Sequence, residues 1–153
     1  MNRAQDVLGC CGVVLYSHVG GHTVDDLAFE PVCAHAEAKG LPVVLHPTVP
    51  AWSEAIKDHW MIPMMGLQVD TSFALLRLIL GGVLERYPRL QIVVPHVGGV
   101  LPYMMGRIDH HTAPKCLHAP HLPGHRFSLG SSPAIHLRIF WCRSPLTPVL
   151  TLN

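Results

Sequence analysis

The sequence has little charge and lacks any long apolar run. Only 14% of its 153 residues are charged, and the formal net charge is +1; a typical globular domain has about a quarter of its residues charged. This balance gives no electrostatic basis for binding nucleic acid or an anionic membrane, and we expect neither partner. No uninterrupted apolar run reaches the roughly 18 residues of a membrane span. With an apolar fraction of 49%, the composition is that of a globular domain.

The five cysteines lack the spacing of a zinc site. Their number is odd, and the adjacent Cys10 and Cys11 are poor partners for each other, so we expect reduced thiols and a cytoplasmic location. Residues 1–6 also lack the apolar core of a secretory signal.

Acidic residues are missing from residues 110–153, where prolines and histidines recur. A solvated domain surface normally mixes both signs of charge. We therefore predict a folded part, residues 1–111, and a proline- and histidine-rich tail, residues 112–153, that is irregular and either disordered or translated out of frame. The tail histidines have no consistent spacing, which favours low-complexity coil over a metal site: His118, His121, His125 and His136.

Short apolar runs alternate with helical patterns along the first part of the chain. The runs predict buried strands at residues 12–16, 42–46 and 90–94, and the helical patterns fall at residues 27–39, 70–86 and 100–111. This alternation predicts parallel strands with covering helices, an α/β architecture. Three strand–helix units are too few to close an eight-stranded barrel.

Two helix starts are predicted from polar side chains that could cap them. Asp25 or Asp26 would cap the helix over residues 27–39, with Cys33 and Ala36 on its apolar stripe. The run Asp70-Thr71-Ser72 would open the next helix, whose apolar stripe would comprise Phe73, Leu76, Leu80, Val83 and Leu84.

A histidine follows two of the predicted strands. His46 would be a metal ligand on a rigid strand end or, alternatively, a strand cap bonded to the backbone. His96, in Pro95-His96-Val97-Gly98-Gly99, would be a second ligand or a general acid–base group. The glycines let the backbone turn sharply and approach a ligand closely. Parallel strands end at the same rim, where α/β barrels keep their active sites, so we expect the two imidazoles to share that rim.

Two further side chains are candidates for binding substrate. The connection over residues 48–68 is unusually long and would form a partial lid over the rim, with Trp52 and Trp60 on it; we assign Trp52 to substrate binding. Arg107 would bind a substrate carboxylate through its guanidinium group or, alternatively, form a surface ion pair with Asp109.

A catalytic metal site generally has three or more protein ligands, and the sequence offers no clear set to join His46. Each carboxylate that could complete the set has another predicted role. Asp70 is expected to cap a helix, Asp58 to lie on the surface of the lid, and Asp109 to lie at a solvated helix end.

Residues 11–111 resemble the amidohydrolase superfamily, in the branch of aminocarboxymuconate-semialdehyde decarboxylase and related aromatic-acid decarboxylases. The resemblance runs through residues 29–32, 45–47, 79–88, 95–99, 101–102 and 106–109. It implies a metal-dependent (β/α)8 barrel, usually with zinc or manganese, of which this chain would contain about three strand–helix units.

The resemblance also implies a role for each candidate residue. His46 matches the metal ligand at the end of the family's fifth strand, and His96 the catalytic histidine after the sixth, which handles the metal-bound water and proton transfers. Arg107 matches the arginine that reaches the active site of a neighbouring subunit in a homodimer and grips a substrate carboxylate. The substrate would be a small carboxylated aromatic or unsaturated acid, and the reaction a decarboxylation or a hydrolysis.

The sequence also departs from the family pattern. It has no His-x-His pair before residue 12, where the family's first strand would carry two metal ligands, and no aspartate after Asp109 to match the ligand of the eighth strand. We therefore expect a truncated reading frame of such an enzyme. As an alternative to a working enzyme, the isolated chain would be catalytically inactive, with no independent function.

Overall fold

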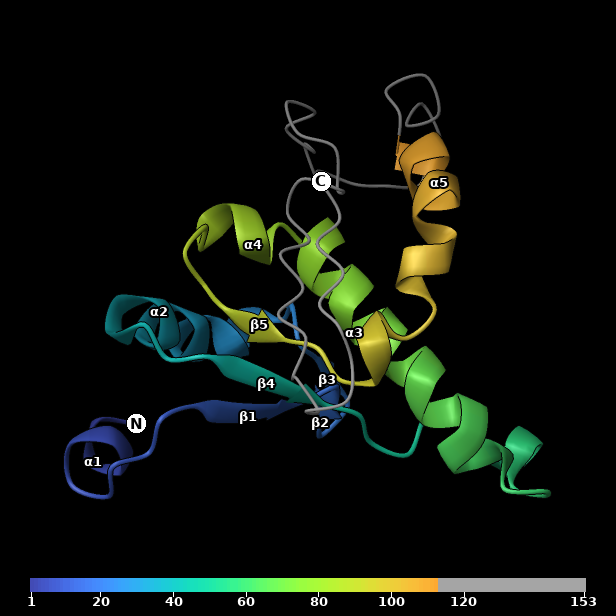
Figure 1. Cartoon of the computed structure of the whole chain (residues 1–153), viewed down its shortest axis with the longest axis horizontal. Coiled ribbons are helices and arrows are strands. Elements are labelled where there is room, and N and C mark those ends of the chain that lie inside the picture. Colours follow the sequence, from blue (N-terminus) through green and yellow to red (C-terminus); the bar gives the residue numbers. More distant parts are fainter. Residues whose placement is uncertain (113–153) are drawn as a thin grey trace, which may run out of the picture.

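The computed structural model describes residues 1–112, so the predicted tail lies outside the described residues except for Thr112. Figure 1 shows the helices and strands, which follow in this order: α1 Asn2–Asp6, β1 Val13–Tyr16, β2 His18–Val19, β3 His22–Thr23, α2 Glu30–Lys39, β4 Val43–His46, α3 Leu67–Leu80, α4 Val83–Arg86, β5 Ile92–Val93 and α5 Leu101–Thr112. Single helical turns precede α2, α3 and α5, and another lies within the β4–α3 connection. The three predicted strands are present, with β5 shorter than predicted, and the single helix predicted over residues 70–86 is two helices, α3 and α4, which are separated at Gly81 and Gly82.

The main sheet is parallel, and its strand order β1–β4–β5 is also the order along the chain. The register pairs Tyr16 with His46 and Val44 with Val93. Crossovers of the usual right hand between strands in chain order place the helices on one face of a sheet. That is the winding of a barrel, whereas a doubly wound sheet reverses its strand order and has helices on both faces.

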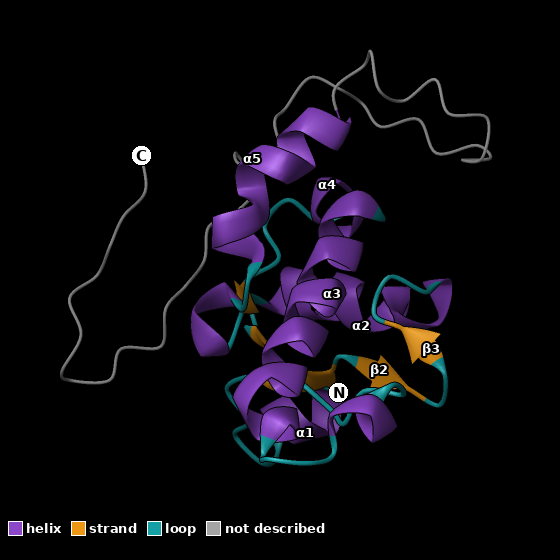
Figure 2. Ribbon diagram, turned by 90° about the vertical axis from the view of Figure 1, so that its right-hand side faces the viewer, coloured by secondary structure: helices purple, strands orange, loops and turns teal. Residues whose placement is uncertain are grey.

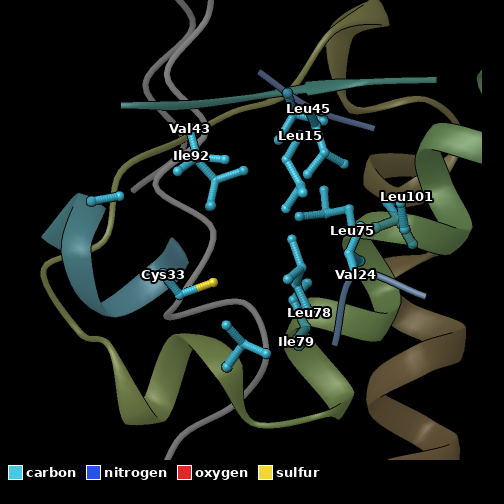
Figure 3. Packing of buried hydrophobic residues seen from close by; sticks show 14 of the residues in the cluster. Leu15, Val24, Cys33, Val43, Leu45, Leu75, Leu78, Ile79, Ile92 and Leu101 are labelled. Atoms are coloured by element: carbon cyan, nitrogen blue, oxygen red, sulfur yellow. The ribbon is translucent and has the colours of Figure 1, made fainter. Parts of the chain in front are cut away.

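The core lies between one face of this sheet and helices α2 and α3. Figure 3 shows Leu15, Val43 and Ile92 pointing from the strands toward Cys33 of α2 and Leu78 of α3. All five side chains are buried, and Leu78 is 0% exposed. Burying a leucine of this kind contributes about 1.5–3 kcal/mol relative to leaving it in water.

The opposite face of the sheet is exposed in the described part of the chain. Side chains alternate between faces along a strand, so Val14 and Tyr16 lie opposite Leu15 and are 58% and 50% exposed. The strands are nonetheless apolar on both faces, as in parallel sheets that are covered on both sides. Residues 1–112 supply the cover for one face only.

A 3-10 turn, Leu27–Phe29, leads into α2 and is capped by Asp26, whose carboxylate accepts the backbone N–H two residues on at 2.8 Å. The predicted cap is therefore Asp26. Asp25 instead forms an ion pair with Arg77 of α3, with 2.7 Å between Oδ1 and Nε. The helix ends at Gly40, whose φ of 64° is the left-handed conformation favoured by glycine.

The prediction for the start of α3 is wrong. A π-helical turn, Ile62–Gly66, runs directly into α3, so Asp70 is not a cap but a buried residue in the helix, 7% exposed. Phe73, predicted on the apolar stripe, is 56% exposed. The physical reason is that Asp70, Thr71 and Ser72 bond to distant loops, and this lets polar groups occupy the buried side of the helix.

The stretch Ile62–Leu80 is the one described helix that is long and apolar enough to cross a membrane, by length and composition alone. A search for uninterrupted apolar runs does not find this stretch, because Asp70 and its polar neighbours interrupt it. In the fold, 44% of an 18-residue window of this stretch is buried, and Leu75 and Leu78 pack in the core. This packing accounts for its apolar composition.

A small antiparallel hairpin follows β1, and in it His18 of β2 pairs with Thr23 of β3. Figure 2 shows this hairpin and α5 on different sides of α3. The hairpin therefore extends the carboxyl end of β1, and α5 begins beyond the end of β5.

Candidate functional site

His46 is the last residue of β4 and lies on the exposed face of the sheet, because Leu45, its neighbour, points into the core. Its Nδ1 lies 2.8 Å from the carbonyl oxygen of Pro47. A carbonyl only accepts, so Nδ1 carries the proton and Nε2 keeps a free lone pair. The hydrogen bond to the backbone that a strand-cap histidine would make is thus present. Metal-ligating histidines make the same kind of bond with the nitrogen that does not bind the metal.

His96 follows β5 and is exposed at the same edge of the sheet, because β4 and β5 are parallel neighbours. Its Nδ1 lies 3.3 Å from the hydroxyl of Thr71 in α3. The predicted common rim for His46 and His96 follows from this strand pairing. Each imidazole has its Nδ1 engaged inside the fold, and within residues 1–112 its Nε2 has no hydrogen bond.

The backbone after β5 is strained. His96, Val97, Gly98 and Gly99 have φ values of 53°, 62°, 83° and 63° in succession. The left-handed region costs a residue with a side chain roughly 1–2 kcal/mol, and a β-branched valine there is unusual. Strain of this kind concentrates at functional sites, where the surroundings hold the chain in place.

The glycines after His96 are predicted to let the backbone approach a ligand; in the structure, Gly99 closely approaches α3. A Cβ added at Gly99 would overlap the hydroxyl of Ser72 and lie 2.5 Å from the carbonyl oxygen of Gln68. Ser72 Oγ also accepts the backbone N–H of Val100 at 2.8 Å. The turn that carries His96 is therefore pressed onto the helix.

Asp70 joins the other two strand ends. Its carboxylate accepts the backbone N–H of Thr48, which follows β4, at 3.0 Å. His18, which follows β1, has Nε2 3.8 Å from Asp70 Oδ1 and 2.6 Å from Thr48 Oγ1. The hydroxyl of Ser17 completes the network, 3.0 Å from that of Thr48. One buried carboxylate thus ties together the loops after two neighbouring strands.

Sequence reasoning missed the role of the run Asp70-Thr71-Ser72 at the rim. A signal for it exists in the helical period: Thr71 lies four residues before Leu75 and seven before Leu78, so it continues the stripe of α3 that enters the core. A polar residue at a core position of a helix requires a partner, and here the partners come from the strand ends.

The predicted substrate-binding residues lie in different parts of the structure. Trp52 is 40% exposed at the start of a 3-10 turn, Ser53–Ile56, in the β4–α3 connection. Trp60, on the same connection, is 79% exposed with a φ of 60°. Arg107 is exposed in the second turn of α5, which extends away from the strand ends (Figure 1).

Within residues 1–112, no group of three or more His, Cys, Asp or Glu side chains could hold a metal ion. His46 fits the role of one ligand, because its Nε2 is free and its ring is oriented by the backbone. Asp70 is bonded to Thr48 beneath the rim. The described residues therefore provide a candidate ligand and not a complete catalytic set of three.

A parallel sheet wound in one direction, with imidazoles at its strand ends, is part of an α/β barrel of the kind that has its active site at that rim. Residues 1–141 match the model of the amidohydrolase family, and the chain belongs to this family. The predicted family is thereby confirmed. Among curated proteins, it is 32% identical over 103 residues to 2-amino-3-carboxymuconate-6-semialdehyde decarboxylase of Dictyostelium discoideum, covering 67% of this chain and 29% of the relative.

Solved structures confirm the partial-barrel fold. The chain is similar to 5-carboxyvanillate decarboxylase from Sphingomonas paucimobilis, with a TM-score of 0.76 and 30% identity over 91% of this chain and 41% of that one. A dihydroxybenzoic acid decarboxylase of a Polaromonas species, solved with manganese and 2-nitroresorcinol, has a TM-score of 0.69 and 25% identity, over 92% of this chain and 43% of that one. The chain thus spans well under half of the proteins it resembles.

Proposed function

We propose that this chain forms part of the active site of a metal-dependent decarboxylase that acts on small carboxylated aromatic acids. The observation that carries the proposal is the pair of rim imidazoles, His46 and His96, each with Nδ1 engaged in the fold and Nε2 unpaired among the described residues. Its relatives support the substrate class. They include 6-methylsalicylic acid decarboxylase of Penicillium expansum, 33% identical over 98 residues, which cover 30% of that relative. They also include gamma-resorcylate decarboxylase of a Rhizobium species, 36% identical over 89 residues, which cover 27% of that relative.

In such a decarboxylation, the bond between the ring carbon and the carboxylate breaks, carbon dioxide leaves, and the electron pair stays on the ring carbon, which then takes a proton. His96 would first take a proton from solvent on Nε2, as a base, and then deliver that proton to the ring carbon, because its Nδ1 is already engaged by Thr71. A divalent metal, zinc or manganese, would polarise substrate oxygen or activate water when bound. His46 would supply one of its ligands through Nε2.

Arg107 and Trp52 would bind the substrate. Arg107 would grip the carboxylate in the site of a neighbouring subunit, and this role is supported by its exposure on α5, which extends away from its own rim. Trp52 would pack against the aromatic ring. A homodimer and a cytoplasmic location remain predictions, which light scattering of the purified protein and fractionation of the source cells would test.

The test is carbon dioxide release by the purified 153-residue protein with 2,6-dihydroxybenzoate and with 6-methylsalicylate, in the presence of manganese or zinc. We expect release that is lost on chelation and in His96→Ala. His110→Ala, which removes an exposed imidazole of α5, is the matched control and should keep the activity. Hydrolysis is the alternative reaction, and turnover without carbon dioxide release would favour it over decarboxylation.

A second hypothesis is that the 153-residue chain alone has no turnover. The observation that favours it is the lack of a three-ligand group within residues 1–112. It predicts weak metal retention and no product with either acid. One equivalent of zinc or manganese that survives exhaustive dialysis, measured by elemental analysis, would overturn it, and His46→Ala should then lower the bound metal.

A further inference from the structure

Thr71 is fully buried in α3, at 0% exposure, and its hydroxyl has two partners. It donates to the carbonyl oxygen of Leu67 at 2.8 Å and lies 3.3 Å from Nδ1 of His96. A hydroxyl has one proton, and the carbonyl can only accept. With that proton directed to Leu67, the contact with His96 is a hydrogen bond only if Nδ1 is the donor.

We propose that Thr71 is a positioning residue that holds His96 in the tautomer protonated on Nδ1 and leaves Nε2 as a free base at the rim. The catalytic meaning of this inference rests on the proposed function, since the proton would be transferred at Nε2. The tautomer itself is a property of the chain, whatever reaction it supports. A general base requires its second nitrogen to be fixed in this way.

Ser72, the next residue, has the same arrangement of bonds. It donates to the carbonyl oxygen of Gln68 at 2.7 Å and accepts the backbone N–H of Val100 at 2.8 Å. Each hydroxyl thus donates to the carbonyl four residues earlier in α3 and contacts the segment after β5. The shared pattern supports the same donor direction for Thr71, whose partner is a ring nitrogen in place of a backbone amide.

The contacts of Thr71 and Ser72 hold a strained turn in place. His96 and Val97 both have left-handed backbone, with φ of 53° and 62°, so the turn is held by its surroundings and not by its own preference. Thr71 fixes the imidazole at its start, and Ser72 fixes Val100 beyond its end. The buried side of α3 therefore sets both the path of the turn and the direction of the imidazole.

The experiment is a long-range proton–nitrogen NMR spectrum of the 15N-histidine-labelled full chain, above about pH 8, where an ordinary imidazole is neutral. The chain has twelve histidines, so the His96 signals are assigned by their loss in His96→Gln. We expect a pyrrole-like shift for Nδ1 of His96 and a pyridine-like shift for Nε2. Thr71→Val, which keeps the shape and removes the hydroxyl, should shift the population toward the other tautomer, and Thr71→Ser should restore it.

Thr112→Val is the matched control. Thr112 also donates to the carbonyl four residues earlier, that of Ile108 at 2.9 Å, and it lies in α5. Its replacement should leave the His96 signals unchanged. A wild-type His96 protonated on Nε2 would overturn the proposal without any variant, so the test survives even if Thr71→Val fails to fold. An unchanged tautomer in folded Thr71→Val would overturn it too.

The outcomes for the tautomer and for the proposed function are separable. A wild-type Nδ1–H tautomer without carbon dioxide release would sink the proposed function and leave the role of Thr71 intact. Carbon dioxide release with His96 protonated on Nε2 would overturn the role of Thr71 and leave the proposed function intact. Where the chain is active, Thr71→Val should lower kcat at least tenfold with KM nearly unchanged, because Thr71 contacts the base and not the substrate.

Discussion

A single methyl group should have opposite effects at two glycines of this chain, Gly99 and Gly106. Gly99 has φ 63° and ψ −131°, a conformation that is nearly exclusive to glycine, and forcing alanine into it costs about 1–3 kcal/mol. The new Cβ would also overlap Ser72 Oγ and lie 2.5 Å from Gln68 O. Moving α3 to relieve an overlap of this kind costs about another 1–3 kcal/mol. Gly99→Ala should therefore destabilise the fold by roughly 4 kcal/mol.

Gly106 lies inside α5, and an added Cβ would meet nothing within 4 Å. Alanine is favoured over glycine in a helix by about 1 kcal/mol, so Gly106→Ala should stabilise the fold by up to that amount. The two variants add the same atoms, and their difference measures the conformational cost at Gly99 together with the packing of the turn against α3.

The assay is urea unfolding followed by circular dichroism. With a slope of about 1.5 kcal/mol per molar urea, Gly99→Ala should lower the midpoint by about 2.5 M, and Gly106→Ala should raise it by about 0.5 M. If the fold is less stable than the expected loss, Gly99→Ala is unfolded without denaturant. Midpoints for the two variants that agree within about 0.5 M would refute the conformational cost and the close packing described at Gly99.

Three further predictions concern the core and its ion pairs. Leu78→Ala should cost about 2–5 kcal/mol, because the side chain is 0% exposed, and a loss below 1 kcal/mol in the same assay would contradict the core described here. Burial raises the pKa of Asp25, but hydrogen bonds, that from Arg77 foremost, outweigh it and lower the pKa overall. The stability that the Asp25 carboxylate contributes is therefore present above the ordinary carboxyl pKa and lost as the pH falls through the lowered pKa. Asp25→Asn should cost up to about 1 kcal/mol at neutral pH and nothing in acid. A cost that persists in acid would show that the ion pair with Arg77 is not its cause. Burial, followed by the charge of Glu30, raises the pKa of Cys33, so iodoacetamide should alkylate it at least tenfold more slowly than the exposed Cys10 at about pH 8, and equal rates by mass spectrometry would be inconsistent with the buried thiol.

The strands could be predicted from the sequence because each is specified locally. Val43, Val44 and Leu45 are apolar on both faces of the chain, and a short run of this kind between turns fits a buried strand. The order of strands and helices then fixes a parallel sheet. The strand-end histidines could be predicted for the same reason, since position along a strand is enough to place them at the rim.

The support beneath the rim could not be predicted, because its partners are far apart in the sequence. Asp70 bonds to Thr48, 22 residues away, and Thr71 to His96, 25 residues away. Local rules assign three consecutive polar residues to a helix start, where such side chains satisfy free backbone amides. Only the packed fold shows that they satisfy the strand ends instead. The proposed tautomer of His96 depends on the contact with Thr71, so it too is beyond the sequence.

His46 lies on a face of the sheet that is otherwise apolar and aromatic. The register pairs His46 with Tyr16, whose ring meets the imidazole edge-on at 5.7 Å, and Val14 and Val44 precede them on the same face. In a (β/α)8 barrel, the face opposite the helices is the interior, which is filled by side chains. Once that face is covered, the free Nε2 of His46 would be enclosed among valines and an aromatic ring, where an unpaired polar atom is costly. Under the proposed function, a metal ion bound to Nε2 would remove that cost, and this would be a physical reason for a histidine at the end of an otherwise apolar strand.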